Sequence, residues 1–110
     1  MSARDKLVRD KIPEIIRARG ITPITHHARQ AEFLNLLADK LQEEAAEFAE
    51  SGVIVELSDI LEVVRAICEA RGISLEELEK MREQKLAERG GFKKRIVLEG
   101  ICGNKPEQIA

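Results

Sequence analysis

Two long helical patterns, separated only by Ser51-Gly52, constrain the fold of this chain more than any other feature. In residues 28–50 and again in residues 53–71, large apolar side chains recur at three- and four-residue steps, the period of an amphipathic helix. Leu, Ala, Glu and Lys, all good helix formers, dominate the first stretch. The pattern predicts a long helical hairpin with a tight turn. The repeating apolar positions are Leu34, Leu37, Leu41, Ala45 and Phe48 in the first helix and Val53, Leu57, Ile60, Val64 and Ile67 in the second, which Gly72 closes.

Shorter elements are predicted before the hairpin. Residues 12–16, Ile-Pro-Glu-Ile-Ile, suit a short helix, because proline is tolerated in a first turn and Gly20 can end the helix. Residues 21–27 contain Pro23 and two threonines, so we expect them to form a loop.

A third helix and a short strand are predicted after the hairpin. Ser74-Leu-Glu-Glu77 is a capping-box signature, and the helix that it begins should run to about Glu88, before Gly90-Gly91. Residues 92–98 have enough β character around Arg95-Ile-Val-Leu98 to predict a short strand. We expect the tail after Gly100 to be loosely held.

Length and composition indicate how the apolar faces are covered. A chain of 110 residues has room for one domain with a modest core, so we expect residues 1–110 to form a single all-α domain. A hairpin with a few short partners cannot cover both of its apolar faces. Pairing two hairpins into a four-helix bundle would do so, which predicts a homodimer, and a tetramer is equally compatible.

Charge and composition also bear on partners and location. The 18 basic and 20 acidic residues leave a net charge of −2, so no basic excess points to a nucleic acid polymer. The start of the chain lacks a signal-peptide core and no apolar run approaches membrane-spanning length, so we expect a cytoplasmic protein without a membrane partner. Cys68 and Cys102 have no metal-ligand spacing, and Cys68 falls within an apolar helical stripe as a buried thiol would.

Two acidic pairs meet the apolar faces of the predicted helices. The first helix contains Glu43-Glu44-Ala-Ala-Glu47 and the second contains Glu56-Leu-Ser-Asp59. A step of three residues leaves both carboxylates of a pair on one helix face. On a helical wheel Glu44 falls inside the apolar arc and so does Glu56, whereas Glu47 and Asp59 lie at the arc edges. Glu62, in contrast, points away from the apolar stripe.

These positions raise the question of a metal ion. A carboxylate buried without compensation costs several kcal/mol or changes its protonation state, and several converging carboxylates repel one another. A divalent cation removes both costs, and oxygen ligands without His or Cys suit Mg²⁺ or Mn²⁺. Acidic pairs with this spacing also occur on ordinary solvated helix faces. From the residues alone, a metal site and a solvated acidic face both stay open.

The residues also resemble a known family. The Glu44-x-x-Glu47 and Glu56-x-x-Asp59 pairs are similar to the metal-binding signature of the all-α nucleoside triphosphate pyrophosphohydrolases, which include MazG-like proteins, dimeric dUTPases and phosphoribosyl-ATP pyrophosphohydrolase. Residues 6–16, Lys-Leu-Val-Arg-Asp-Lys-Ile-Pro-Glu-Ile-Ile, resemble the start of short MazG-like, phosphoribosyl-ATP-pyrophosphohydrolase-like proteins. Residues 89–92, Arg-Gly-Gly-Phe, followed by Ile96-Val-Leu98, resemble their end.

The resemblance implies an activity and a set of metal ligands. Enzymes of the pyrophosphohydrolase family cleave a nucleoside triphosphate, or a related nucleotide, between the α and β phosphates and release a nucleoside monophosphate and pyrophosphate. Glu44, Glu47, Glu56 and Asp59 would hold Mg²⁺, with Mn²⁺ as a substitute, and Glu43 would assist beside them. Glu47 is our first choice for the carboxylate that accepts a proton from the attacking water.

The resemblance also implies basic residues that meet the phosphates. Lys85 and Arg89 match basic positions expected to do so, and Lys6, Arg9 and Lys11 are further candidates for the same role.

The chain departs from the family pattern at two points. Only eight residues separate Glu47 from Glu56, fewer than is usual, and Leu86 stands where many relatives have Asn after the lysine. Both departures leave base and sugar preference open. Phosphoribosyl-ATP is an alternative substrate, and a non-catalytic helical dimer that binds a partner protein is the alternative from another class.

Overall fold

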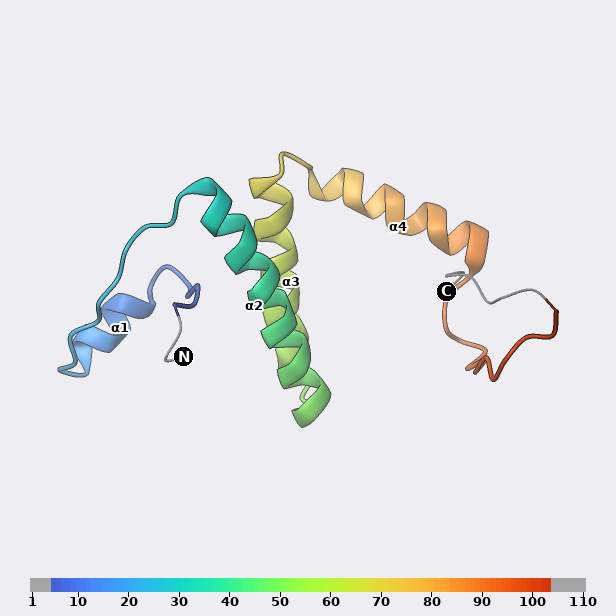
Figure 1. Cartoon of the computed structure of the whole chain (residues 1–110), viewed down its shortest axis with the longest axis horizontal. Helices are drawn as coiled ribbons and strands as arrows, with labels where there is room; N and C mark the ends of the chain where they lie inside the picture. The colour runs from blue at the N-terminus through green and yellow to red at the C-terminus, as the bar shows by residue number, and fades with distance from the viewer. Residues whose placement is uncertain (1–4, 104–110) are drawn as a thin grey trace. The chain divides into compact units, whose positions relative to one another are not determined.

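The computed structural model describes residues 5–103, and within that range the chain forms four helices and no strand (Figure 1). The all-α fold and the helical hairpin are therefore confirmed. The chain falls into two compact units, Met1–Leu78 and Glu79–Ala110. The helices are α1 (Ile12–Ala18), α2 (Gln30–Ser51), α3 (Val55–Ala70) and α4 (Leu75–Arg89).

The turn between α2 and α3 is as tight as its sequence predicts. Gly52 adopts a left-handed conformation (φ 67°), and its N–H donates a hydrogen bond of 2.8 Å to the carbonyl of Phe48, which ends α2. A residue with a Cβ would be strained in this conformation. The Ser51 hydroxyl accepts a hydrogen bond of 3.1 Å from the N–H of Val53 and stabilises the next step of the turn.

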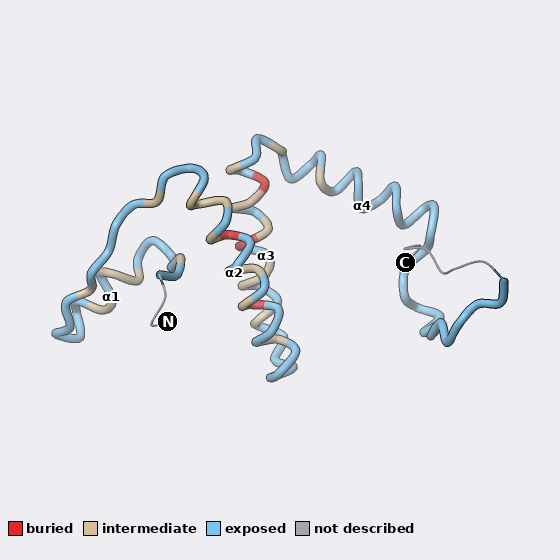
Figure 2. Tube along the Cα trace, viewed as in Figure 1, coloured by how far each residue is buried: buried red, intermediate tan, exposed pale blue. Residues whose placement is uncertain are grey.

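The core of the first unit lies along the contact between α2 and α3 (Figure 2). Leu37 on α2 and Val63 and Cys68 on α3 are the buried apolar residues of the described chain. The burial of Cys68 agrees with its predicted place in an apolar stripe. The fourth buried residue is charged: it is Glu44.

Much of the apolar surface of the hairpin stays exposed in a single chain. Ile54, in the turn, is 71% exposed, and Leu61 on α3 is 62% exposed. Large exposed apolar surfaces commonly mark sites of contact with another molecule. The chain alone leaves uncovered the kind of face that the predicted bundle would bury. Other exposed apolar residues at the same end of the hairpin are Val53, Val55 and Leu57.

Helix α4 begins with the capping box that the sequence predicts. The N–H of Glu77 donates a 3.0 Å hydrogen bond to the Ser74 hydroxyl, and the N–H of Ser74 donates one of the same length to the Glu77 carboxylate. The Ser74 N–H lowers the pKa of Glu77, because it stabilises the ionised carboxylate.

Within residues 5–103, none of the helices combines the length and the apolar character needed to cross a bilayer.

The short strand predicted for residues 92–98 is wrong. Arg95 has a φ of 58°, outside the extended region, and its N–H donates a 3.1 Å hydrogen bond to the carbonyl of Phe92 in a turn. A strand also needs a partner for its backbone groups, and the described residues contain no other strand. Of the tail expected to be loosely held, residues 104–110 lie outside the described part of the chain.

The small core makes a specific prediction for stability. Leu37 is 2% exposed, so Leu37→Ala should lower the free energy of unfolding by about 2–5 kcal/mol through lost burial and a residual cavity. Ile24→Ala is the matched control, because Ile24 is 99% exposed and its truncation should change stability by less than about 0.5 kcal/mol. Urea denaturation followed by circular dichroism measures both. Equal losses in the two variants would contradict a core centred on Leu37.

Candidate metal centre

The hairpin brings the acidic residues of its two helices to one height. Glu44 lies eight residues before Gly52 and Asp59 lies seven residues after it. At a rise of about 1.5 Å per residue, both are at nearly the same distance from the turn. Because α2 packs against α3, acidic residues on the facing sides of the two helices meet.

Five carboxylates form two groups that share one member. In the first group, single oxygens of Glu43, Glu44 and Glu47 lie within 4.8 Å of one another, and in the second the same holds for Glu44, Glu56 and Asp59. Glu44 therefore joins the carboxylates of α2 to those of α3. The structure thus brings together all five of the acidic residues that the sequence singled out.

Glu44 is the most buried member of the cluster. It is 6% exposed, and this burial is the main reason that its pKa is raised above the ordinary 4.5. The neighbouring carboxylate of Glu47 raises it further, whereas Lys40 acts in the opposite direction. Glu56 and Asp59 are half-buried and Glu47 is exposed, while Glu62 is exposed to solvent as predicted.

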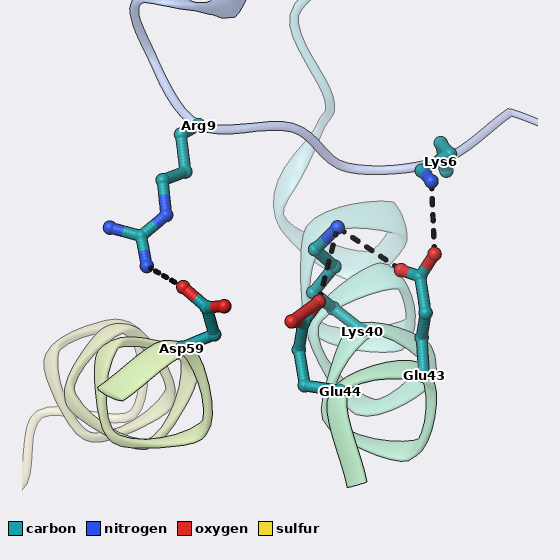
Figure 3. Close-up of polar contacts among 6 residues, drawn as sticks. All are labelled: Lys6, Arg9, Lys40, Glu43, Glu44 and Asp59. Carbon is teal, nitrogen blue, oxygen red and sulfur yellow. Dashed lines mark hydrogen bonds and ion pairs between the residues drawn. The ribbon is translucent and has the colours of Figure 1, made fainter. Parts of the chain in front are cut away.

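Basic side chains from a distant segment contact the cluster (Figure 3). Nζ of Lys6 donates a 2.9 Å hydrogen bond to Oε2 of Glu43, and Nη2 of Arg9 donates a 2.7 Å hydrogen bond to Oδ1 of Asp59. Lys6 thus contacts α2 and Arg9 contacts α3. The bond from Lys6, with further help from Lys40, lowers the pKa of Glu43, and Glu43 in turn raises the pKa of Lys6.

Lys40 is a member of the site that the sequence did not lead us to predict. Its Nζ lies 3.0 Å from Oε1 of Glu43 and 3.7 Å from Oε2 of Glu44, and its side chain is only 20% exposed. The signal was readable, because a lysine three and four residues before two glutamates on one helix lies over both of them. The 3.7 Å separation exceeds a direct hydrogen bond, so this lysine compensates the buried charge of Glu44 only in part.

Ser51 is a second residue of the site that was not predicted. Its hydroxyl donates a 3.0 Å hydrogen bond to Oε1 of Glu56 while it accepts the Val53 N–H. The turn therefore orients one carboxylate of the cluster. The sequence indicates Ser51 only as part of the helix break, and nothing in its spacing indicates this contact.

The other three predicted phosphate-binding residues are exposed. Lys85 and Arg89 lie on α4 and belong to the second unit. Lys11, just before α1, is exposed and has no ion pair with another described residue. Within the first unit, Lys6 and Arg9 are the predicted phosphate-binding residues that contact the acidic cluster.

A separate group of possible metal ligands lies near the start of α2. Asp5, His26 and Glu32 each offer an atom within 4.8 Å of the others, and Nε2 of His26 is 3.0 Å from Oε2 of Glu32. Asp5 and His26 are exposed and Glu32 is half-buried. Without a buried charge comparable to Glu44, this group has less need of a cation.

Comparison with known proteins yields a partial relative. A curated protein of Mycolicibacterium smegmatis, described as uncharacterized, is 50% identical to this chain over 42 residues. Those residues are 38% of this chain and 43% of that protein, so the match spans less than half of either. No family model and no solved structure matches the chain.

The buried carboxylate makes a prediction for the metal-free protein. Because the pKa of Glu44 is raised in the folded protein, protonated Glu44 favours the folded state. This contribution to the free energy of unfolding is full below about pH 4.5, the ordinary pKa, and is lost as the pH rises through the folded-state pKa. Glu44→Gln removes this titration. In EDTA at neutral pH, the variant should be more stable than the wild type, because an amide costs less to bury than an ionised carboxylate.

Chemical denaturation at neutral pH and below pH 4.5 measures the effect. The advantage of Glu44→Gln should disappear at the lower pH, where the wild-type carboxyl is also neutral. The exposed Glu62→Gln should differ from the wild type by less than about 0.5 kcal/mol at neutral pH. If Glu44→Gln destabilises the metal-free protein at neutral pH, the assigned cost of the buried charge is contradicted.

Proposed function

We propose that the chain is a Mg²⁺-dependent nucleoside triphosphate pyrophosphohydrolase, which cleaves between the α and β phosphates and takes part in cleaning the nucleotide pool. The observation that supports this most is the convergence of four further carboxylates from α2 and α3 on the buried Glu44. The proposal treats the chain as one functional domain of a cytoplasmic protein, with no nucleic acid polymer as a partner.

The donor atoms fit a magnesium ion. All five are carboxylates, and Mg²⁺ and Mn²⁺ prefer such hard oxygen ligands. A cation beside Glu44 would also relieve the desolvated charge that raises the pKa of this residue. Bound there, Mg²⁺ would neutralise phosphate charge and acidify a bound water.

The surroundings of each carboxylate suggest its role. Glu44, Glu56 and Asp59, which combine burial with proximity, would hold the ion together with Glu47. Glu43 is already engaged by two lysines, which lower its pKa and make it a weak proton acceptor. Exposed Glu47, which has no ion pair within the described residues, is therefore the better candidate to accept the proton of the attacking water.

The phosphates would meet the basic residues near the cluster. Lys6 and Arg9 already lie against Glu43 and Asp59, within reach of an anion bound to the same metal. Lys85, Arg89 and Lys11 stay in the proposal as phosphate contacts on the strength of the family resemblance alone.

Pyrophosphate release from a panel of ribo- and deoxyribonucleoside triphosphates tests the proposal. We expect release with Mg²⁺, none with EDTA, and losses of about 100-fold or more in Glu44→Gln and Asp59→Asn, since each substitution removes a charged ligand. Glu62→Gln, an equivalent change at an exposed position on α3, should retain wild-type activity.

Other outcomes would redirect the assignment. Release that is unchanged in both site variants, or absent for every triphosphate, would refute the triphosphate assignment. Phosphoribosyl-ATP would then be the substrate to try, and failure with it would favour a helical dimer that binds a partner protein.

The proposed enzyme is a homodimer, or a pair of homodimers, in which two hairpins complete a four-helix bundle. The exposed apolar residues of the turn and of α3 support this assembly. Sedimentation equilibrium should give at least twice the chain mass of 12.3 kDa. Leu61→Lys should shift the protein towards monomer, whereas Glu62→Gln should not. A wild-type monomer at micromolar concentration would contradict the assembly.

A further inference from the structure

The segment of residues 6–9 crosses from one helix of the acidic cluster to the other (Figure 3). Lys6 is bound to Glu43 on α2 and Arg9 to Asp59 on α3. Three residues of extended chain cover about 10 Å, roughly the distance between the axes of two packed helices. The segment is therefore long enough to lie over the cluster as a strap, and we use that name for residues 6–9.

The strap offsets part of the negative charge of the cluster. Five carboxylates face three cationic side chains, Lys6, Arg9 and Lys40, which leaves a formal charge of −2 when all groups are ionised. With the strap withdrawn the charge would be −4, because only Lys40 would remain. The strap thus supplies part of the neutralisation that a divalent ion would otherwise supply.

The contact of Arg9 falls on a carboxylate that a metal would also use. Its Nη2 lies 2.7 Å from Oδ1 of Asp59, one of the proposed ligands, so guanidinium and metal would compete for the charge of the same carboxylate. Both partners are partly solvent-exposed, with side chains 56% and 37% accessible, so the ion pair is weak enough to be displaced. A displaced guanidinium is a strong bidentate partner for phosphate.

We propose that the strap exchanges its carboxylates for phosphate when metal binds, and so couples the binding of the two ligands. Without metal, Lys6 and Arg9 neutralise Glu43 and Asp59. When metal occupies the cluster, the two basic side chains turn to the phosphates of the substrate. The inference rests on the proposed metal site. It adds that the ion pairs of the strap weaken metal binding when no substrate is bound.

Titration with Mn²⁺ alone tests the competition, with free ion measured by its electron paramagnetic resonance signal. Arg9→Ala and Lys6→Ala should each bind Mn²⁺ more tightly than the wild type, by up to about fivefold, the usual limit for an exposed ion pair. Arg17→Ala removes the same charge from an exposed position on α1 and controls for general electrostatics. Circular dichroism of each variant is the control for folding.

Inorganic pyrophosphate then tests the coupling. It should increase the affinity of the wild type for Mn²⁺, and this increase should be several-fold smaller in Arg9→Ala, since coupling between two ligands is reciprocal. Arg9→Lys keeps the positive charge but loses the bidentate guanidinium. Its pyrophosphate-induced increase in Mn²⁺ affinity should lie between those of the wild type and Arg9→Ala. Arg17→Ala should match the wild type.

Trypsin offers a readout on the unmodified chain, because it cleaves after the strap residues themselves. Mn²⁺ alone should accelerate cleavage after Lys6 and Arg9, pyrophosphate together with Mn²⁺ should slow it, and cleavage after Arg17 should change little. Mass spectrometry identifies the products.

The failures are distinguishable. If the wild type does not bind Mn²⁺, the proposed metal site and the strap proposal are both refuted. If it binds Mn²⁺ and Glu44→Gln weakens that binding, but both strap variants have unchanged or weaker affinity, the strap proposal alone is overturned and the metal site stands.

Discussion

The small core of the helical hairpin contains one buried charged group, and the arrangement of the candidate site depends on it. Glu44 lies on the same buried side of α2 as Leu37, at the contact with α3 that forms the core. Ordinary folding would place an apolar residue there, since burial penalises an ionised carboxylate. Four further carboxylates surround Glu44 and add to this cost, so the position, which water reaches poorly, needs positive charge.

The chain supplies that charge from two sources, and neither is complete. Lys40 comes from the same helix but stays 3.7 Å from Glu44. Lys6 and Arg9 come from the N-terminal segment but bind Glu43 and Asp59, on either side of the buried group. Glu44 itself therefore keeps a raised pKa within a cluster that is otherwise partly paired. In the proposed site, a divalent ion completes the compensation, and the phosphates of the substrate then engage the displaced basic groups.

Sequence periodicity predicted the features that depend on local structure. The hairpin, its tight turn at Gly52, the capping box at Ser74 and the inward position of Glu44 all follow from helical spacing and capping chemistry, and all are confirmed. Such features involve residues that are near neighbours in sequence, where the geometry of a helix is sufficient. The strand at residues 92–98 failed because β character in isolation does not supply a pairing partner.

Contacts between distant segments could not be predicted in the same way. Lys6 meets Glu43 and Arg9 meets Asp59 across 37 and 50 residues, and no periodicity relates a loop to a helix face. The sequence indicated basic residues near the start of the chain but not their partners. Lys40, in contrast, was one helical turn from two glutamates and could have been found by the same spacing argument that found the acidic pairs.

Whether the buried carboxylate belongs to a cation site can be seen in the anomalous difference map of crystals grown with Mn²⁺. We expect a peak between α2 and α3, with oxygens of Glu44 and Asp59 among its ligands. A map without a peak there, or with its peak at Asp5, His26 and Glu32 instead, would contradict a cation site at Glu44.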